Sequence, residues 1–358
     1  MLPYWAIFIL ASLAAIGAKP LRQIRRDGTV PVRFTPSWLF VIFAITLFVG
    51  LRYQVGGDWY AYVRIFDQSQ FLSPEEAISR GDAGYWALNY LVGQSGGSLV
   101  WVNLAAGLLF AVGTTIFCLS LPRPWLALAA AIPYVIVVVG MGYARQGVAL
   151  GFVMTGLVAL SRERFIRFLV WVAIGALFHK TAIVMIALGA ASVNKNRFLW
   201  IPIIGLAGVG GYMVFLADYA DQMIAGYIGA DYTSSGALIR ISMNMIPGFL
   251  FLIYRKRFVV SEAASKFWTV AALLSSALFV AIFAGVPSTA LDRMALYLLP
   301  LQLFVFSHLP YVLGRTGRQQ TSVTLGILAY YAIVLFVWLN FAAHSQWWIP
   351  YRIWPEIA

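Results

Sequence analysis

The chain has 358 residues, of which 61% are hydrophobic and only 11% are charged, and its formal net charge is +12. So apolar a composition excludes a water-soluble globular domain, and unbroken apolar blocks exclude a β-barrel, whose strands alternate in hydrophobicity over about 10 residues. The sequence therefore predicts an all-α, polytopic integral membrane protein with a single transmembrane domain over residues 1–358.

Apolar segments predict about twelve membrane-spanning helices. The first, residues 2–18, is as short as a signal sequence but lacks a basic start and a small-residue cleavage site, so we interpret it as a retained span. The others are expected at 38–51, 99–119, 125–141, 146–160, 165–178, 181–193, 198–217, 237–254, 267–284, 294–313 and 321–340. An even number of spans places both termini on one side of the membrane.

The distribution of basic residues predicts the orientation of these spans. One face collects 17 of the 25 Lys and Arg residues with only three acidic ones, so the positive-inside rule makes it cytoplasmic. Its basic residues are Lys19, Arg22, Arg25, Arg26, Arg33, Arg123, Arg162, Arg164, Arg167, Lys195, Arg197, Arg255, Lys256, Arg257, Lys266, Arg315 and Arg318. The positive charge thus reflects topology and gives no evidence for nucleic-acid binding.

The opposite, outer face carries the remaining basic residues and the larger loops. The expected outer segments are 52–98, 216–236 and 344–358, all rich in aromatic residues that suit either a membrane interface or stacking on sugars. The outer basic residues are Arg52, Arg64, Arg80, Arg145, Lys180, Arg240, Arg293 and Arg352. They are either separate side chains that reach for the interface or one anion site, since a planar, permanently charged guanidinium matches phosphate or pyrophosphate.

Two short helical segments predict polar residues below the membrane surface. The span 38–51 covers about 21 Å of a hydrocarbon core of roughly 30 Å, which leaves Arg52 recessed, where an arginine usually pairs with an anion. The spans 165–178 and 181–193 are equally short, so His179 and Lys180 between them should be buried in protein or line a wet cavity. His179 is therefore either a general base or a hydrogen-bonded structural residue.

Helical spacing adds further candidates to the outer face. Asp58 and Tyr62 lie four residues apart, as do Arg293 and Tyr297, so each pair would share one helix face. Asp58 is a second candidate base, or a residue that orients an arginine. The single cysteine, Cys118, lies in an apolar run and predicts core packing, with neither a disulfide nor a cysteine metal site within one chain.

Motifs for ATP hydrolysis, zinc proteolysis, serine hydrolysis and metal-dependent nucleotide-sugar transfer are absent from the sequence. A reaction of lipid-linked phosphates at the outer leaflet is not excluded. Pyrophosphate is already a good leaving group, so such a reaction needs no ATP. Arginines could stabilise the developing charge there without a metal or another cofactor.

The residues singled out above resemble one known family. Residues 50–62 (GLRYQVGGDWYAY), then Arg145-Gln146, residues 178–180 (FHK), 236–240 (GALIR) and 292–297 (DRMALY), are similar in order and spacing to the EpsG branch of the Wzy-type polysaccharide polymerases. The resemblance runs from about residue 40 to the C-terminus.

This resemblance implies a GT-C-like fold in the bacterial inner membrane, with the active site facing the periplasm. The expected activity is the transfer of a growing glycan from undecaprenyl pyrophosphate to a lipid-linked repeat unit, for an exopolysaccharide, a capsule or an O-antigen. A flippase and a chain-length regulator would be partners, and nucleic acid would not. Two alternatives remain open: a ligase of the O-antigen type and a transporter of a lipid-linked anion.

The expected site follows from these assignments. Arg52, Arg145, Arg240 and Arg293, with Lys180, would bind pyrophosphate, and of these Arg145 and Arg293 are the catalytic candidates. His179, or failing it Asp58, would deprotonate the acceptor hydroxyl. Tyr60, Tyr62 and Tyr297 would orient the sugar or the phosphate.

Overall fold

The computed structural model describes residues 1–18, 30–191, 202, 236–284, 286 and 288–355. Within these ranges the backbone is helical apart from connecting segments and one isolated β-bridge. The main helices are α1 (Leu2–Gly17), α2 (Pro36–Gly50), α3 (Trp59–Ser69), α4 (Pro74–Ser79), α5 (Ala83–Gln94), α6 (Leu99–Leu119), α7 (Pro124–Ala131), α8 (Ala144–Ser161), α9 (Phe165–Phe178), α10 (Val184–Ala191), α13 (Ala237–Tyr254), α14 (Glu262–Phe283), α15 (Ser288–Leu296), α16 (Leu299–Leu313) and α17 (Gly317–Phe341).

These helices confirm the prediction of an all-α, polytopic membrane protein. Six stretches of the described residues are long and apolar enough to cross a membrane: Leu99–Leu119, Ala144–Ser161, Ala237–Arg257, Glu262–Phe283, Leu291–Leu313 and Gly317–Phe341. Shorter apolar helices cover Leu2–Gly17, Pro36–Gly50, Pro124–Gly140, Phe165–Phe178 and Lys180–Ala190. The predicted span 198–217, apart from residue 202, and most of the predicted outer segment 216–236 lie outside the described residues.

Local sequence explains where several helices begin. Thr316 caps α17 with its side chain, and the side chain of Gln319 reaches back, which satisfies backbone N–H groups that have no partner within the helix. Ser73 and Glu76 form the same arrangement at the start of α4. Pro36 opens α2, where the missing N–H of proline costs nothing.

The loops predicted to be cytoplasmic meet at one end of the helix bundle. Ser261 Oγ donates a hydrogen bond to the carbonyl of Ser161 at 2.7 Å, and Arg162 Nη2 donates one to the carbonyl of Val30 at 3.3 Å. The described basic residues of these loops therefore share a face, in agreement with the alternating direction of the helices. Lys19, Arg22, Arg25, Arg26, Lys195 and Arg197 lie outside the described residues.

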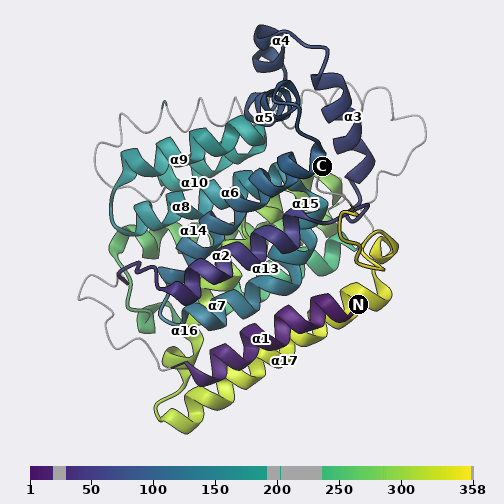
Figure 1. Cartoon of the computed structure of the whole chain (residues 1–358). Coiled ribbons are helices and arrows are strands. Elements are labelled where there is room, and N and C mark those ends of the chain that lie inside the picture. Colours follow the sequence, from purple (N-terminus) through teal and green to yellow (C-terminus); the bar gives the residue numbers. More distant parts are fainter. Residues whose placement is uncertain (19–29, 192–201, 203–235, 285, 287, 356–358) are drawn as a thin grey trace.

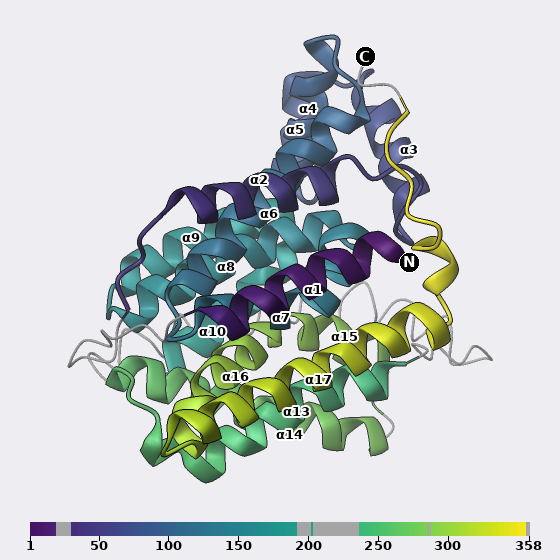
Figure 2. The ribbon, with the colours of Figure 1, turned by 60° about the horizontal axis from the view of Figure 1, so that its bottom comes forward.

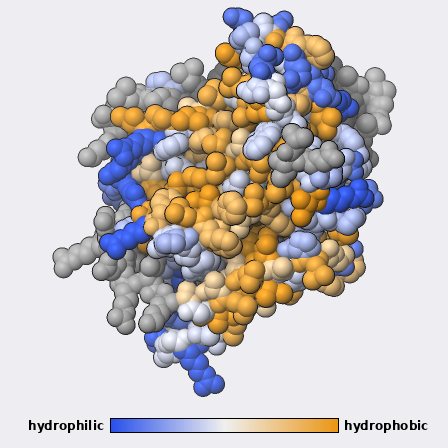
Figure 3. Space-filling view, viewed as in Figure 1, coloured by the Kyte–Doolittle hydropathy of each residue, from blue (hydrophilic) through white to orange (hydrophobic). Residues whose placement is uncertain are grey.

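The predicted outer segment 52–98 folds as three helices, α3, α4 and α5, which project beyond the bundle as a cap (Figures 1 and 2). In space-filling view, hydrophobic residues cover the middle of the molecule and hydrophilic residues gather over the cap (Figure 3). The chain thus has the surface of a membrane-embedded bundle that carries a polar cap at one end.

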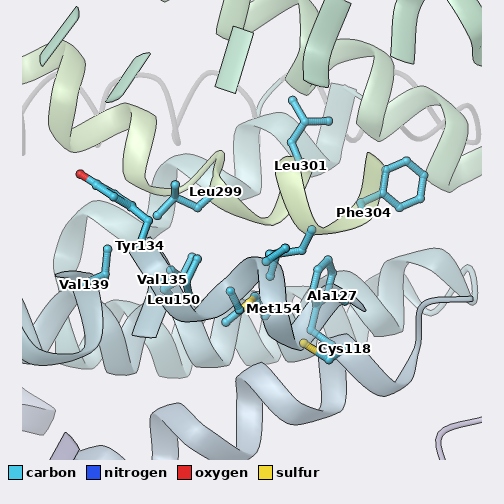
Figure 4. Packing of buried hydrophobic residues seen from close by; sticks show 14 of the residues in the cluster. Cys118, Ala127, Tyr134, Val135, Val139, Leu150, Met154, Leu299, Leu301 and Phe304 are labelled. Atoms are coloured by element: carbon cyan, nitrogen blue, oxygen red, sulfur yellow. The ribbon is translucent and has the colours of Figure 1, made fainter. Parts of the chain in front are cut away.

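Buried packing fixes the helices beneath this cap. The core joins α6, α7, α8 and α16 through residues such as Cys118, Met154 and Phe304 (Figure 4), and Cys118 packs in this core as predicted. The helices α1 and α17 run antiparallel side by side (Figures 1 and 2). Beyond α17, the Tyr4 hydroxyl donates to the Trp348 carbonyl at 2.6 Å, so the C-terminal segment lies at the same end as the cap.

Candidate active site

Asp82 lies at the centre of a polar cluster between the cap and the bundle. Its Oδ2 accepts a hydrogen bond from Arg145 Nη1 at 2.8 Å and lies 3.3 Å from His179 Nδ1, while its Oδ1 accepts one from the Lys180 backbone N–H at 3.0 Å. One carboxylate therefore joins the start of α5, the start of α8 and the turn after α9.

The backbone around Asp82 explains this placement. Asp82 caps α5 with a left-handed φ of 60°, a conformation that aspartate tolerates better than most residues. Gly84 follows, and a Cβ there would lie 3.1 Å from the Leu177 carbonyl oxygen in α9. The absence of a side chain at Gly84 allows α5 to approach the end of α9, where His179 begins the next turn.

The electrostatics of Asp82 favour an ionised carboxylate. Burial by itself would raise its pKa, but the hydrogen bond from His179, the charge of that imidazole and the Lys180 N–H outweigh burial, so the pKa of Asp82 is lowered. When His179 Nδ1 carries the proton donated to Asp82, His179 Nε2 keeps its lone pair. This is the tautomer that a general base would require.

Asp58 approaches the same cluster from the start of α3. This half-buried side chain lies near Tyr62, Arg145, Arg293 and His179, all of which favour its ionised form. Burial raises the pKa of Asp58 despite these partners. The two aspartates thus differ: Asp82 is held ionised, whereas Asp58 takes up a proton more readily than an ordinary carboxylate.

A glycine turn positions Asp58. Gly56 has a φ of 104°, and a Cβ there would lie 2.3 Å from the Met141 carbonyl oxygen. Only glycine combines this conformation with so close an approach to the backbone before α8. Gly56 of the motif therefore allows the cap to pack closely against the bundle.

Arg293, Lys180 and Tyr297 complete this side of the site. Gln146 Nε2 donates a hydrogen bond to the Arg293 carbonyl at 3.3 Å. The Arg293 side chain is exposed, and its positive charge favours the ionised form of Asp58. Thr181 Oγ1 donates to the buried Tyr297 hydroxyl at 3.0 Å, which ties the turn after α9 to α15 and α16. The Lys180 side chain is exposed.

Arg240 belongs to a second cluster beside the first. Its Nε and Nη2 donate hydrogen bonds to the two carboxylate oxygens of Asp292 at 2.6 and 2.7 Å. Arg240 and Asp292 therefore form a bidentate ion pair. Tyr143 lies within electrostatic range of Arg240, Asp292, Asp58 and Arg293. The two clusters therefore adjoin each other at the outer ends of α8, α13 and α15.

Arg52 is buried within the protein. Its side chain is 1% exposed, and Nη1 donates to the Val49 carbonyl while Nε and Nη2 have no hydrogen-bond partner in the described part of the chain. The C-terminal segment covers it through an antiparallel bridge between Arg52 and Ile353. Arg52 lies within electrostatic range of Tyr62 and Tyr85, so it supports the cap from below.

The predicted tyrosines divide between the interior and the surface. Tyr62 is 2% exposed and packs against Tyr85 with ring centroids 5.6 Å apart, whereas Tyr60 is 55% exposed on the outside of α3. Tyr62 and Tyr297 are therefore packing residues of the interior, whereas Tyr60 lies on the surface of the cap.

Sequence analysis overlooked two residues of these clusters, Asp82 and Asp292. Asp82 is 63 residues from Arg145 and 97 from His179, so no local spacing could connect them. One available signal was the position of Asp82 between Gly81 and Gly84 at the start of an apolar helix. Within the described ranges, no group of three His, Cys, Asp or Glu residues is arranged to hold a metal ion.

Comparison with known sequences assigns the chain to one family. A sequence model of the EpsG family matches residues 37–353, which is nearly the whole chain. Searches of curated proteins and of solved structures returned no significant match.

Proposed function

This chain belongs to the EpsG family, a Wzy-like polymerase family, and we propose that it joins lipid-linked oligosaccharide repeat units into a polysaccharide. Family membership and the helical bundle together make it a polysaccharide polymerase-type membrane protein. The finer proposal is a glycosyltransferase that moves a growing glycan from undecaprenyl pyrophosphate to a hydroxyl group of the next lipid-linked unit.

The observation that carries this proposal is the contact of Asp82 with both His179 and Arg145. The contact holds His179, the proposed base, next to the permanently charged guanidinium of Arg145. Glycosyl transfer from a pyrophosphate needs these two functions at one place: removal of a proton from the acceptor and stabilisation of the departing anion.

In the proposed reaction, the acceptor hydroxyl oxygen attacks the anomeric carbon of the donor. Its proton passes to His179 Nε2, and Asp82 stabilises the imidazolium that forms. Asp58 is the second candidate for this role, since it lies close to the same groups and its raised pKa suits proton uptake.

As the new bond forms, the bond between the anomeric carbon and the pyrophosphate oxygen breaks, and its electron pair leaves with the pyrophosphate. Arg145 and Arg293 stabilise this charge, with Arg240 and Lys180 binding the same group. The exposed fork of Arg293 is the best placed to meet an incoming ligand. The proposed chemistry requires no metal, because guanidinium groups supply the positive charge.

The proposed setting is the bacterial inner membrane, with the cap and the polar clusters on the periplasmic side. The loops rich in basic residues lie at the opposite end of the bundle, which the positive-inside rule assigns to the cytoplasm. Undecaprenyl-linked repeat units are the proposed substrates, and a flippase and a chain-length regulator are the proposed partners.

The decisive experiment incubates the purified protein with lipid-linked repeat units and resolves the products by length. A ladder of lipid-linked oligomers supports polymerisation. Transfer of one glycan to a different acceptor, without a ladder, would instead identify a ligase, and movement of the lipid across vesicles without any new glycosidic bond would identify a transporter.

A further inference from the structure

An apolar groove runs down the bundle from the second polar cluster, between α13 and α17. Its volume is about 460 Å³, within the range of roughly 300–1,000 Å³ that is usual for small-ligand sites. Along its length it is lined by Ile239, Ile246, Tyr330, Ile333, Val334 and Phe341. Both helices belong to the stretches that are long and apolar enough to cross a membrane, so a bilayer around the bundle would surround the groove with hydrocarbon.

The groove opens sideways, toward the lipid. Ile239 is 58% exposed and Ile333 is 61% exposed, although both belong to membrane-spanning helices. Side chains exposed in this way contact hydrocarbon, so an apolar chain can enter from the bilayer without crossing water. A closed cavity between the same helices would not allow that entry.

One end of the groove is polar and reaches the candidate active site. Arg240, Gly236 and His344 line that end, and Arg240 holds Asp292, the neighbour of Arg293. Among the described residues, Arg240 and Asp292 carry opposite charges here, and Arg293 adds a positive charge beside them. Tyr143 lies within electrostatic range of all three and of Asp58.

We propose that this groove binds the polyisoprenyl chain of a lipid-linked substrate, with the pyrophosphate held at the end marked by Arg240 and Arg293. The inference rests on the proposed function and adds to it the place where the lipid binds. The apolar lining fits the isoprenoid, and the positive end fits the pyrophosphate. A volume of about 460 Å³ accommodates only the first few isoprene units, so the rest of the chain stays in the bilayer.

Continuity with the site favours an isoprenoid over an ordinary phospholipid. The polar end of the groove leads toward Asp58 and His179, so a pyrophosphate anchored there carries its sugar toward the candidate base. A structural phospholipid would need no such connection.

Photo-cross-linking tests the proposal without requiring polymerisation. The probe is a polyprenyl pyrophosphate with a diazirine near the head of the chain and no sugar, added to the full-length protein in vesicles of phosphatidylethanolamine and phosphatidylglycerol. We expect labelled peptides from both α13 and α17, including residues 239 and 333. Unlabelled polyprenyl pyrophosphate should compete at least tenfold better than added phosphatidylglycerol.

Two matched variants of α17 provide the control. Ile333→Trp fills the groove and should reduce labelling at least fivefold, whereas Phe336→Trp, at an exposed apolar position outside the lining, should leave it unchanged. Equal competition by phosphatidylglycerol would make the groove a general lipid site and overturn the proposal. Equal labelling of both variants, with both folded, would overturn it as well.

The same preparations separate this inference from the proposed function. A protein that is labelled in the groove but makes no glycosidic bond would retain the lipid site and lose the polymerase assignment. A protein that polymerises repeat units with no labelling on α13 or α17 would keep the function and lose the groove.

Discussion

The carboxylate of Asp82 lies 3.3 Å from the imidazole of His179, although 97 residues separate them in the chain. This contact brings the cap, which carries Asp82, onto the turn that follows α9. The contact between Asp82 and His179, the candidate base, therefore forms only when the cap packs against the bundle. Substitutions at Asp82 and at His179 should consequently affect catalysis through the same group.

The first prediction concerns Asp82→Asn, which keeps the shape of the side chain but removes its charge. We expect the polymerisation rate to fall by about 10²–10⁴-fold, because the imidazolium loses its stabilising partner and the tautomer is no longer fixed. Initial rates with purified lipid-linked repeats measure this loss. The control is Asp67→Asn, an exposed aspartate of the same cap, which should retain the parent rate. Equal rates for both variants and the parent would remove Asp82 from the site.

His179→Gln tests the base directly. Glutamine cannot accept the proton, so the rate should fall by about 10²–10⁴-fold while lipid-linked substrate still binds. In a deletion strain this variant should accumulate single repeat units instead of long chains. A purified variant within about threefold of the parent, a difference of only about 0.7 kcal/mol in the barrier, would rule out His179 and direct attention to Asp58.

The pair of Arg240 and Asp292 calls for a double-mutant cycle. Arg240→Met alone removes the guanidinium from a mostly buried carboxylate and should destabilise the fold by roughly 3–5 kcal/mol. Adding Asp292→Leu should restore much of the thermal stability, measured by unfolding in detergent, because neither charge is then left buried. If Arg240 also binds substrate, polymerisation stays lost in the double variant. A stable and fully active double variant would assign the pair to folding alone.

The sequence allowed good prediction of the helices and poor prediction of the contacts between them. The expected spans 99–119, 165–178 and 237–254 coincide with α6, α9 and α13, because apolar runs bounded by polar residues are local signals. The roles of Asp82 and Arg52 depend on partners far along the chain. The short predicted span 38–51 indicated that Arg52 lies below the membrane surface. Only the fold shows that the C-terminal segment covers Arg52.

Orientation can be tested by cysteine labelling, since the single native cysteine, Cys118, is buried and can be replaced by alanine. A cysteine at Glu75, exposed on α4 of the cap, should react with a membrane-impermeant maleimide added to intact cells with a permeable outer barrier. A cysteine at Lys256, between α13 and α14, should react only after lysis. Reaction of residue 256 in intact cells would invert the proposed topology.

Asp58 and Asp82 should respond to pH with opposite signs. Burial raises the pKa of Asp58, so the ionised form is disfavoured in the folded state and lowers stability at pH values above that pKa. This destabilisation decreases as the pH falls toward the ordinary carboxyl value of about 3.9 and disappears below it, where Asp58 is protonated in both states. Asp82 has a lowered pKa, so its stabilising effect is complete above about 3.9 and is lost only as the pH falls through its lower value.

Two substitutions to asparagine therefore give contrasting stability profiles. Asp58→Asn should raise the unfolding temperature at pH 7, since asparagine keeps the shape of the side chain without a buried charge, and most of this gain should be lost near pH 4. Asp82→Asn should lower the unfolding temperature at pH 7, and the loss should persist at pH 4. Thermal unfolding of the parent and both variants at the two pH values measures these differences.

A loss of stability at pH 7 in Asp58→Asn would contradict this prediction. It would show that Arg145 and Arg293 stabilise the charge of Asp58 more than burial destabilises it. Asp58 would then be a residue that orients arginines, and His179 would remain as the base.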